Sequence, residues 1–220
     1  MVGWPRRGEI LAGNNPVSVE ESALLDSLRR GDEAAFARLV GEHHASLRRV
    51  ARLYVANAAI ADEVVQDTWL GVIRGIWAFE GRSSLKTWIF RILVNRARTR
   101  AVRESSRASH TGSLAAESGA ESKPPGSPEH SPPDPDSSPE RSVLSRELGE
   151  RLRAVIDGLP ANLRTVLWLR DVEGWSSEEV CSALAIQETN QRVLLHRARA
   201  RARSALEPYL EDAREGTRRR

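Results

Sequence analysis

The sequence predicts an all-α protein made of two small helical domains joined by a Pro-rich linker. Strand-forming residues are sparse, with only two Tyr and three Phe among 220 residues, whereas Ala, Leu, Arg and Glu dominate and favour helices. In both outer parts of the chain, apolar residues recur at helical spacing. Seven of the eleven prolines lie between residues 104 and 141, which marks that stretch as the linker.

The first domain is expected over residues 19–103. Gly31 is suited to end its first helix, and Asp32 is suited to cap the second. A serine in the turn before Leu85 is the expected cap of the last helix. Trp77 and Phe79, which precede that turn, are expected to pack in the core. Four helices are predicted in this domain, over about 20–30, 32–54, 58–76 and 85–103.

The segments outside the helical domains differ from them in composition. Residues 104–141 combine proline with Ser, Gly, Glu and Asp, so they cannot bury enough apolar surface to offset their ordering entropy. As a coil of about 38 residues, this linker separates its ends by roughly 35 Å, and fully stretched it reaches about 125 Å. Residues 1–18 are predicted to be a disordered tail that lacks the apolar stretch of a signal peptide, and residues 211–220 a basic tail.

The second domain is expected over residues 142–210. Pro160 suits the first turn of a helix, and Ser176 or Ser177 is placed to cap the next one. Trp168 and Trp175 are expected to pack the small core of this domain. Four helices are predicted, over 142–156, 160–170, 177–184 and 189–206, with Pro208 limiting the last. The last two, joined by a short turn, have the form of a helix-turn-helix that reads a DNA groove.

Positive charge is concentrated in two segments, although the net charge is only +3. Residues 81–103 contain seven cations and no acid, and residues 189–206 contain five arginines and no acid. A solvated helix usually mixes both signs for internal pairing. Two acid-free basic helices therefore indicate a polyanionic partner, and nucleic acid fits best.

Six short motifs occur in an order that resembles the extracytoplasmic-function group of sigma-70 factors. Region 2 of that group is similar to Asp62-Glu63-Val64-Val65-Gln66-Asp67-Thr68-Trp69-Leu70, Phe79-Glu80-Gly81-Arg82 and Lys86-Thr87-Trp88-Ile89-Phe90-Arg91-Ile92-Leu93-Val94-Asn95. Region 4 is similar to Leu159-Pro160, Leu169-Arg170-Asp171-Val172-Glu173-Gly174 and Leu195-His196-Arg197-Ala198-Arg199. The resemblance covers both domains and implies a two-domain helical fold.

The resemblance implies a function in promoter recognition and melting. Region 2 of the family docks on core RNA polymerase through an acidic helix and captures the non-template strand of the −10 element. A cationic groove with aromatic platforms suits such a strand, although Trp88 is expected to pack more than to touch a base. The polymerase-binding residues implied are Asp62, Glu63, Gln66 and Asp67. The −10 residues implied are Arg82, Ser83, Lys86, Trp88, Arg91, Asn95, Arg96 and Arg98.

Region 4 of the family reads the −35 element as duplex, with the N-terminus of its recognition helix in the major groove. Gln and Asn side chains can pair with adenine and Arg with guanine. The segment Gln187–Val193 departs from the commonest family form, so promoter choice cannot be transferred from other members. The −35 residues implied are Ser176, Thr189, Asn190, Gln191, Arg192, His196 and Arg197.

Two other classes of protein can be compared with the sigma-factor interpretation. A stand-alone helix-turn-helix regulator is the alternative, but it has no need of the acidic face or of the first basic helix. A DNA-processing enzyme requires clustered carboxylates or an activated nucleophile, and neither is present. No catalytic residue, cofactor or metal site is expected, because His43-His44 lacks further ligands at metal spacing.

The single cysteine, Cys181, and the lack of a long apolar run predict a cytoplasmic protein without membrane insertion. The resemblance adds an expected anti-sigma factor to the partners, which are core RNA polymerase and promoter DNA in duplex and melted form.

Overall fold

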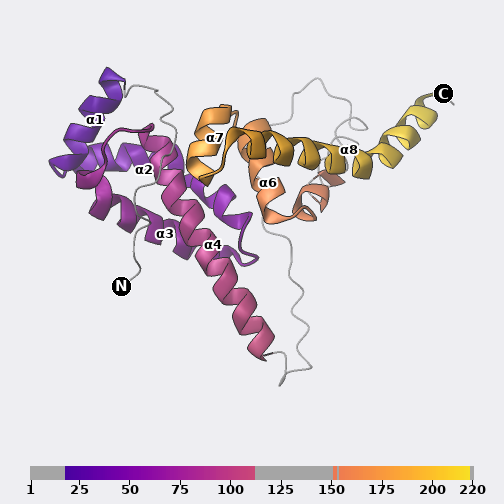
Figure 1. Cartoon of the computed structure of the whole chain (residues 1–220), viewed down its shortest axis with the longest axis horizontal. Coiled ribbons are helices and arrows are strands. Elements are labelled where there is room, and N and C mark those ends of the chain that lie inside the picture. The colour runs from indigo at the N-terminus through magenta and orange to yellow at the C-terminus, as the bar shows by residue number, and fades with distance from the viewer. Residues whose placement is uncertain (1–17, 112–150, 153, 219–220) are drawn as a thin grey trace, which may run out of the picture.

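A computed structural model describes residues 18–111, 151–152 and 154–218 (Figure 1). Within these ranges the regular elements are helices, as the sequence predicts. Several predicted segments lie outside the described residues. They are the tail up to residue 17, the linker from residue 112 onward, the first part of the helix expected over 142–156, and residues 219–220.

The N-terminal unit has four α-helices and one short 3₁₀ turn. Ser18, Asp32 and Asn57 cap the first three helices, each by accepting a backbone N–H in the first turn with its side-chain oxygen. The expected serine cap of the fourth helix is Ser84, whose side-chain oxygen accepts the backbone N–H of Thr87 at 3.2 Å. The Glu21 carboxylate also accepts the backbone N–H of Leu85. The elements are α1 (Val19–Arg29), α2 (Glu33–Arg52), α3 (Ala58–Gly75), η1 (Ile76–Ala78) and α4 (Leu85–Thr111).

Helices α3 and α4 pack closely because two glycines face the α4 side chains. A Cβ atom on Gly71 would lie 2.7 Å from the Arg96 guanidinium, and one on Gly75 would lie 3.2 Å from the Trp88 ring. The Trp88 ring would have to shift to admit a Cβ at position 75, whereas the end of the flexible Arg96 side chain could move aside at position 71. The two glycines lie one helical turn apart, so both are on the face of α3 that packs against α4.

The C-terminal unit contains the predicted helix-turn-helix. Ser176 and Glu179 form a reciprocal capping box at the start of the first of its two helices. The turn between them passes through Ala185, whose φ of 54° lies in the left-handed region. Residues 154–157 are helical and precede α6 (Ala161–Leu167), the π-helical turn η2 (Trp168–Val172), α7 (Ser177–Leu184) and α8 (Glu188–Arg218).

Two helices extend further than the sequence predicts. Helix α4 continues to Thr111, into the segment expected to be linker, since that stretch contains no proline and Arg100 forms an i,i+4 ion pair with Glu104. Helix α8 continues past Pro208 to Arg218, so the expectation that this proline limits the helix is wrong. The hydrogen bond that proline removes is that to the carbonyl of Ser204, which is an exposed residue.

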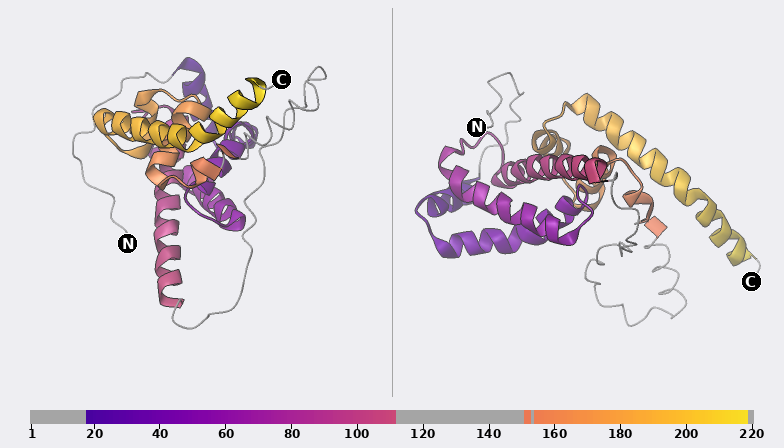
Figure 2. Two further views of the ribbon diagram at one scale, coloured as in Figure 1. Left: turned by 90° about the vertical axis from the view of Figure 1, so that its right-hand side faces the viewer. Right: turned by 90° about the horizontal axis from the view of Figure 1, so that it is seen from below.

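The two units are packed on each other, and their apolar side chains form one continuous cluster. Helix α7 lies beside the first turns of α4, while the last turns of α4 and α8 project from the body in different directions (Figures 1 and 2). Trp175 is the central contact. Its ring is 4.7 Å from that of Phe90 on α4, in an edge-to-face arrangement. The expectation that Trp175 packs only in its own domain is therefore incomplete.

Candidate nucleic-acid interfaces

The first basic surface lies on the turn before α4 and on the outward side of that helix. Arg82 is exposed and paired with Glu80, and Ser83 donates its hydroxyl to the Ser84 carbonyl oxygen at 3.3 Å. On α4, Asn95 is exposed and Arg91 is half-buried. These residues form the open part of the surface that the sequence assigns to the −10 element.

The aromatic residues near this surface have different exposures. Phe79 is buried and its ring is 5.0 Å from that of Trp88, which is half-buried and also rests on Gly75. This arrangement agrees with the expectation that Trp88 packs, and part of its side chain stays accessible. Trp77 is 69% exposed, so the expectation that it packs in the core is wrong. It lies in the 3₁₀ turn, where Ile76 points inward in its place.

Three cations assigned to the −10 surface are engaged inside the protein. The Lys86 ammonium lies 4.3 Å from the centroid of the Trp175 ring and 3.9 Å from a Glu179 carboxylate oxygen. Arg98 donates to the carbonyl oxygen of Leu184 at 3.5 Å. Arg96 is half-buried against α3 at Gly71. Of these, Lys86 and Arg98 face the C-terminal unit.

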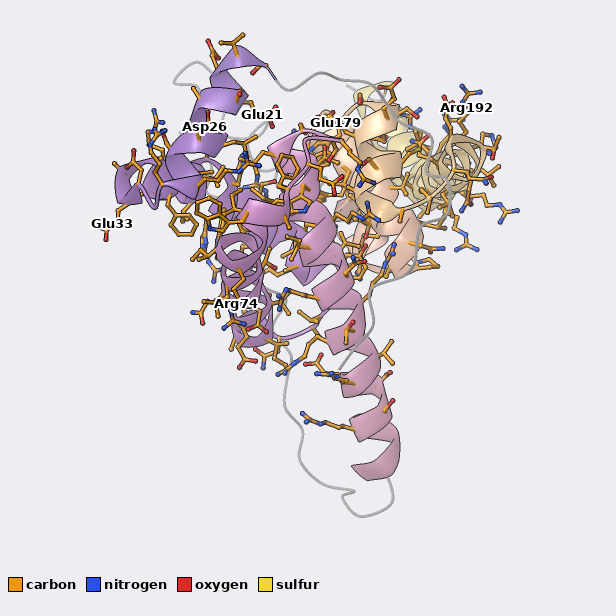
Figure 3. The ribbon with its side chains drawn as sticks, turned by 60° about the vertical axis from the view of Figure 1, so that its left-hand side comes forward. Glu21, Asp26, Glu33, Arg74, Glu179 and Arg192 are labelled. Carbon is orange, nitrogen blue, oxygen red and sulfur yellow. The ribbon has the colours of Figure 1, made fainter. Side chains whose placement is uncertain are left out.

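The second basic surface is the start of α8. Thr189, Asn190, Arg192, His196 and Arg197 are all exposed there, and Arg192 forms an i,i+4 ion pair with Glu188 at 2.6 Å. Figure 3 shows Arg192 on the outer side of the C-terminal unit, whereas Glu179 lies at the junction of the two units. The exposed first turns of α8 have the form of a recognition helix ready to enter a groove.

Two residues assigned to the −35 surface have structural roles. Ser176, although exposed, uses its hydroxyl in the capping box of α7. Gln191 is 1% exposed and accepts the Ser177 hydroxyl at 3.1 Å, so the expectation that it reads a base is wrong for this conformation. Spacing could have shown this, because Gln191, Leu195 and Ala198 form the buried stripe of α8.

The acidic face of α3 is partly neutralised within the chain. Asp62 makes a bidentate pair with Arg48, with distances of 2.6 and 3.1 Å, and Glu63 pairs with Arg100 at 2.9 Å. Gln66 and Asp67 are exposed, and among the described residues neither side chain forms a hydrogen bond or an ion pair.

An apolar ridge continues from this acidic face and was missed by the sequence analysis. Leu70 and Ile73 are 47% and 50% exposed, and with Gln66 and Trp77 they recur at intervals of three and four residues. That spacing places the four side chains on one stripe of α3 and its extension. The signal was present in the sequence, but the same residues could equally have formed a buried stripe.

Glu173 joins the two units electrostatically. Its carboxylate accepts the Ser46 hydroxyl at 2.6 Å and the Arg49 guanidinium at 3.0 Å, both from α2. Burial alone raises the pKa of Glu173, but these two partners and the Trp168 indole N–H outweigh it and hold that pKa below its usual value. Because the pKa is lowered, this contact contributes stability above the ordinary pKa of glutamate and loses it as pH falls through the folded value.

No cluster of His, Cys, Asp or Glu suited to a metal ion was found among the residues that the structure describes. In the same ranges, none of the helices combines the length and apolar character needed to cross a membrane.

A helix-turn-helix unit, a second cationic helix and an acidic helix face together define a class of DNA-binding transcription protein. Comparison with known proteins identifies the family. Residues 39–107 match Sigma-70 region 2, and residues 149–201 match Sigma-70, region 4. The match of the N-terminal unit to region 2 excludes the alternative of a stand-alone helix-turn-helix regulator.

Curated relatives are similar over nearly their whole length. The ECF RNA polymerase sigma-E factor of Haemophilus influenzae is 30% identical over 190 residues, which cover 86% of this chain and 97% of the relative. The RNA polymerase sigma-H factor of Pseudomonas aeruginosa is 29% identical over 194 residues, covering 88% and 97%.

Solved structures share the fold. CnrH, in complex with the cytosolic domain of CnrY, has a TM-score of 0.57 at 21% identity, covering 86% of this chain and 97% of that one. The sigma factor RpoE of Bartonella quintana, in complex with the anti-sigma factor NepR, also has a TM-score of 0.57, at 22% identity and 78% and 96% coverage.

The chain belongs to the sigma-70 family of RNA polymerase sigma factors, in its extracytoplasmic-function group. It acts with core RNA polymerase on promoter DNA in transcription initiation, and it is not an enzyme.

The buried amide of Gln191 generates a prediction. Its Nε2 atom has no hydrogen-bond partner among the described residues, and an unpaired buried donor costs about 1–3 kcal/mol. Gln191→Leu should therefore raise the free energy of unfolding by about 1 kcal/mol in urea titrations and leave upstream-element binding intact. A loss of sequence preference at that element in the folded variant would return Gln191 to the base-reading residues.

Proposed function

We propose that three separate surfaces of this sigma factor divide the work of promoter recognition. The exposed start of α8 reads the −35 element, the turn 79–84 and the outward side of α4 hold the −10 strand, and the outward face of α3 binds core polymerase. The observation that carries the proposal is the exposure of Thr189, Asn190 and Arg192 at the start of a helix whose opposite side is buried. Polar side chains at the start of a recognition helix are those that reach base edges.

The −10 surface combines cations with an accessible amide. Arg82 and Arg91 provide positive charge for the backbone of a single strand, and Asn95 offers both a donor and an acceptor to an unpaired base. Lys86, Arg96 and Arg98 belong to the same surface once their internal contacts are released. Trp88 contributes through the accessible part of its side chain and by holding the turn through Phe79.

The polymerase-binding surface joins the acidic face to the apolar ridge. Asp62, Glu63, Gln66 and Asp67 supply charge and hydrogen bonding, which set orientation and association rate more than affinity. Leu70 and Ile73 supply apolar area, and its burial on docking is favourable.

An anti-sigma partner and a cytoplasmic location are also part of the proposal. One similar solved structure is a complex of the sigma factor RpoE with the anti-sigma factor NepR, and another is a complex of CnrH with the cytosolic domain of CnrY. The first of these supports an anti-sigma partner for this chain. Core polymerase and promoter DNA are partners found in the cytoplasm, and this supports a cytoplasmic location.

Arg192 should carry sequence preference at the −35 element. Arg192→Ala should cost about 1–3 kcal/mol at particular upstream bases, because a guanidinium can pair bidentately with guanine. The measurement is binding to a set of duplexes with single-base changes. Arg203→Ala, an exposed arginine further along α8, is the matched control and should weaken all duplexes alike. An equal loss on every duplex for Arg192→Ala would reduce that residue to a phosphate contact.

The polymerase-binding surface can be separated into its two components. Asp67→Ala should weaken binding to core polymerase mainly at low salt, since exposed charges are screened by ions. Leu70→Ala should weaken it by about 1–2 kcal/mol at all salt concentrations. Val172→Ala, an equally exposed apolar residue on the other unit, serves as the control. Full affinity in both α3 variants would exclude this face as the docking site.

A further inference from the structure

The turn before α4 is held at both ends by helix α1. At its start, the Arg29 guanidinium donates to the carbonyl oxygen of Phe79 at 2.9 Å. At its end, the Glu21 carboxylate accepts the backbone N–H of Leu85, and Figure 3 shows Glu21 on the side of α1 that is turned to α4. Both hydrogen bonds are made to the backbone, so they fix the path of the chain through residues 79–85.

The two anchoring residues lie far enough apart on α1 to set the separation of the two ends of the turn. Glu21 and Arg29 are eight positions apart, or roughly 12 Å along a helix that rises about 1.5 Å per residue. Helix α1 is itself fixed to the body, because Leu25 is buried in the core and Leu24 and Leu28 pack against it. A fixed helix with two anchors leaves the ends of the turn little freedom to move apart.

Between the anchors, local hydrogen bonds shape the turn. Gly81 takes the left-handed conformation with a φ of 69°, and Arg82 pairs with Glu80. Among the described residues, the hydrogen bonds printed for residues 80–84 all go to partners within four positions along the chain. The Arg82 side chain is 79% exposed. The tip of the turn, which carries part of the proposed −10 surface, is therefore open and depends on its two ends for its position.

The polar side chains of α1 that reach other elements are directed at this turn. Within the part of the chain that the structure describes, Glu21 and Arg29 make the hydrogen bonds of α1 side chains to other elements. The Leu85 N–H is one of the first four donors of α4, which have no acceptor inside the helix, and a carboxylate there also meets the positive end of the helix dipole. Helix α1 lies outside residues 39–107, which match region 2.

We propose that α1 positions the turn for capture of the −10 strand, with Glu21 and Arg29 as positioning residues. The proposal rests on the promoter-reading function above, because the turn belongs to the −10 surface. Neither residue touches the strand. They keep the turn in the shape that binds, and a site that is already ordered loses less conformational freedom on binding. When an anchor is lost, only the ordered fraction of the turn is competent, so the apparent dissociation constant rises by the inverse of that fraction.

The test compares removal of each anchor with a conservative replacement. Glu21→Ala removes the acceptor, whereas Glu21→Gln keeps an acceptor oxygen on a side chain of the same length. Arg29→Ala removes the donor, whereas Arg29→Lys keeps a charged donor. Glu20→Ala and Arg30→Ala are the matched controls, since each removes a like charge at the exposed position next to an anchor.

The measurement is the binding of a single-stranded oligonucleotide to the full chain assembled with core polymerase. The oligonucleotide carries the −10 sequence of a promoter that the unmodified chain opens, and binding is repeated over a range of salt concentrations. A contact to one phosphate of a single strand adds about 0.7 to the steepness of log K against log salt. Arg82→Ala, in the proposed −10 surface, is the reference for a direct contact and should reduce the steepness by about that amount.

Glu21→Ala and Arg29→Ala should each weaken binding of the oligonucleotide about three- to tenfold, in the range of one lost hydrogen bond. The salt dependence should stay as in the unmodified chain, because neither residue meets a phosphate. Glu21→Gln and Arg29→Lys should recover most of the affinity, and both control variants should bind normally. Affinity for core polymerase and for a −35 duplex should be unchanged throughout. Urea unfolding verifies that each variant is folded, and Glu21→Ala decides should Arg29→Ala not fold.

Full affinity for the oligonucleotide in the folded alanine variants would overturn the positioning role. A reduced salt dependence in Arg29→Ala would also overturn it, since that result would make Arg29 a strand contact. Equal losses on the oligonucleotide, the −35 duplex and core polymerase would show that α1 only stabilises the fold. An unchanged salt dependence in Arg82→Ala would instead contradict the proposed −10 surface, so failure of the proposed function is recognised in a different variant.

Discussion

The burial of Trp175 against α4 is the interaction on which the arrangement of the whole molecule depends. The ring follows Gly174, whose positive φ allows the tight turn, and its backbone is fixed by a hydrogen bond from Trp175 N–H to the Leu169 carbonyl oxygen at 2.9 Å. Removing a buried aromatic side chain of this kind costs about 3–5 kcal/mol. A residue expected to stabilise one small domain therefore joins two, and it fixes the position of α7 over the −10 surface.

Charge plays a different part from this apolar contact. Many of the ionic groups expected to meet DNA or polymerase are already paired inside the chain, as Asp62 is with Arg48, Glu63 with Arg100 and Arg192 with Glu188. Such exposed pairs contribute only about 0–1 kcal/mol each, so they exchange readily for an external partner. Binding then replaces one set of ion pairs with another, whereas separation of the two units requires the exposure of Trp175 and Phe90.

Helical periodicity and capping residues predicted the helices well, because caps such as Asp32 and Ser176 act locally and need no knowledge of the rest of the chain. Residue type alone failed at Gln191, a polar side chain that occupies a core position of α8. The contact of Trp175 with Phe90 was beyond sequence reasoning, since it joins residues 85 positions apart across an expected linker. The exposure of individual aromatic residues was also beyond sequence reasoning, because nothing in the local sequence distinguishes the exposed Trp77 from the buried Phe79.

The distance between the two units, in the free chain and on the promoter, tests the account most directly. Spin labels at Ala45→Cys on α2 and Glu178→Cys on α7, in a Cys181→Ser background, use two exposed positions on opposite sides of the contact. We predict a single short distance in the free chain and a distance longer by tens of ångströms in the complex with core polymerase and promoter. The −10 and −35 elements lie roughly 85 Å apart along the duplex. A free chain that already shows the long distance, or a promoter complex that keeps the short one, would therefore contradict this account of the contact between the two units.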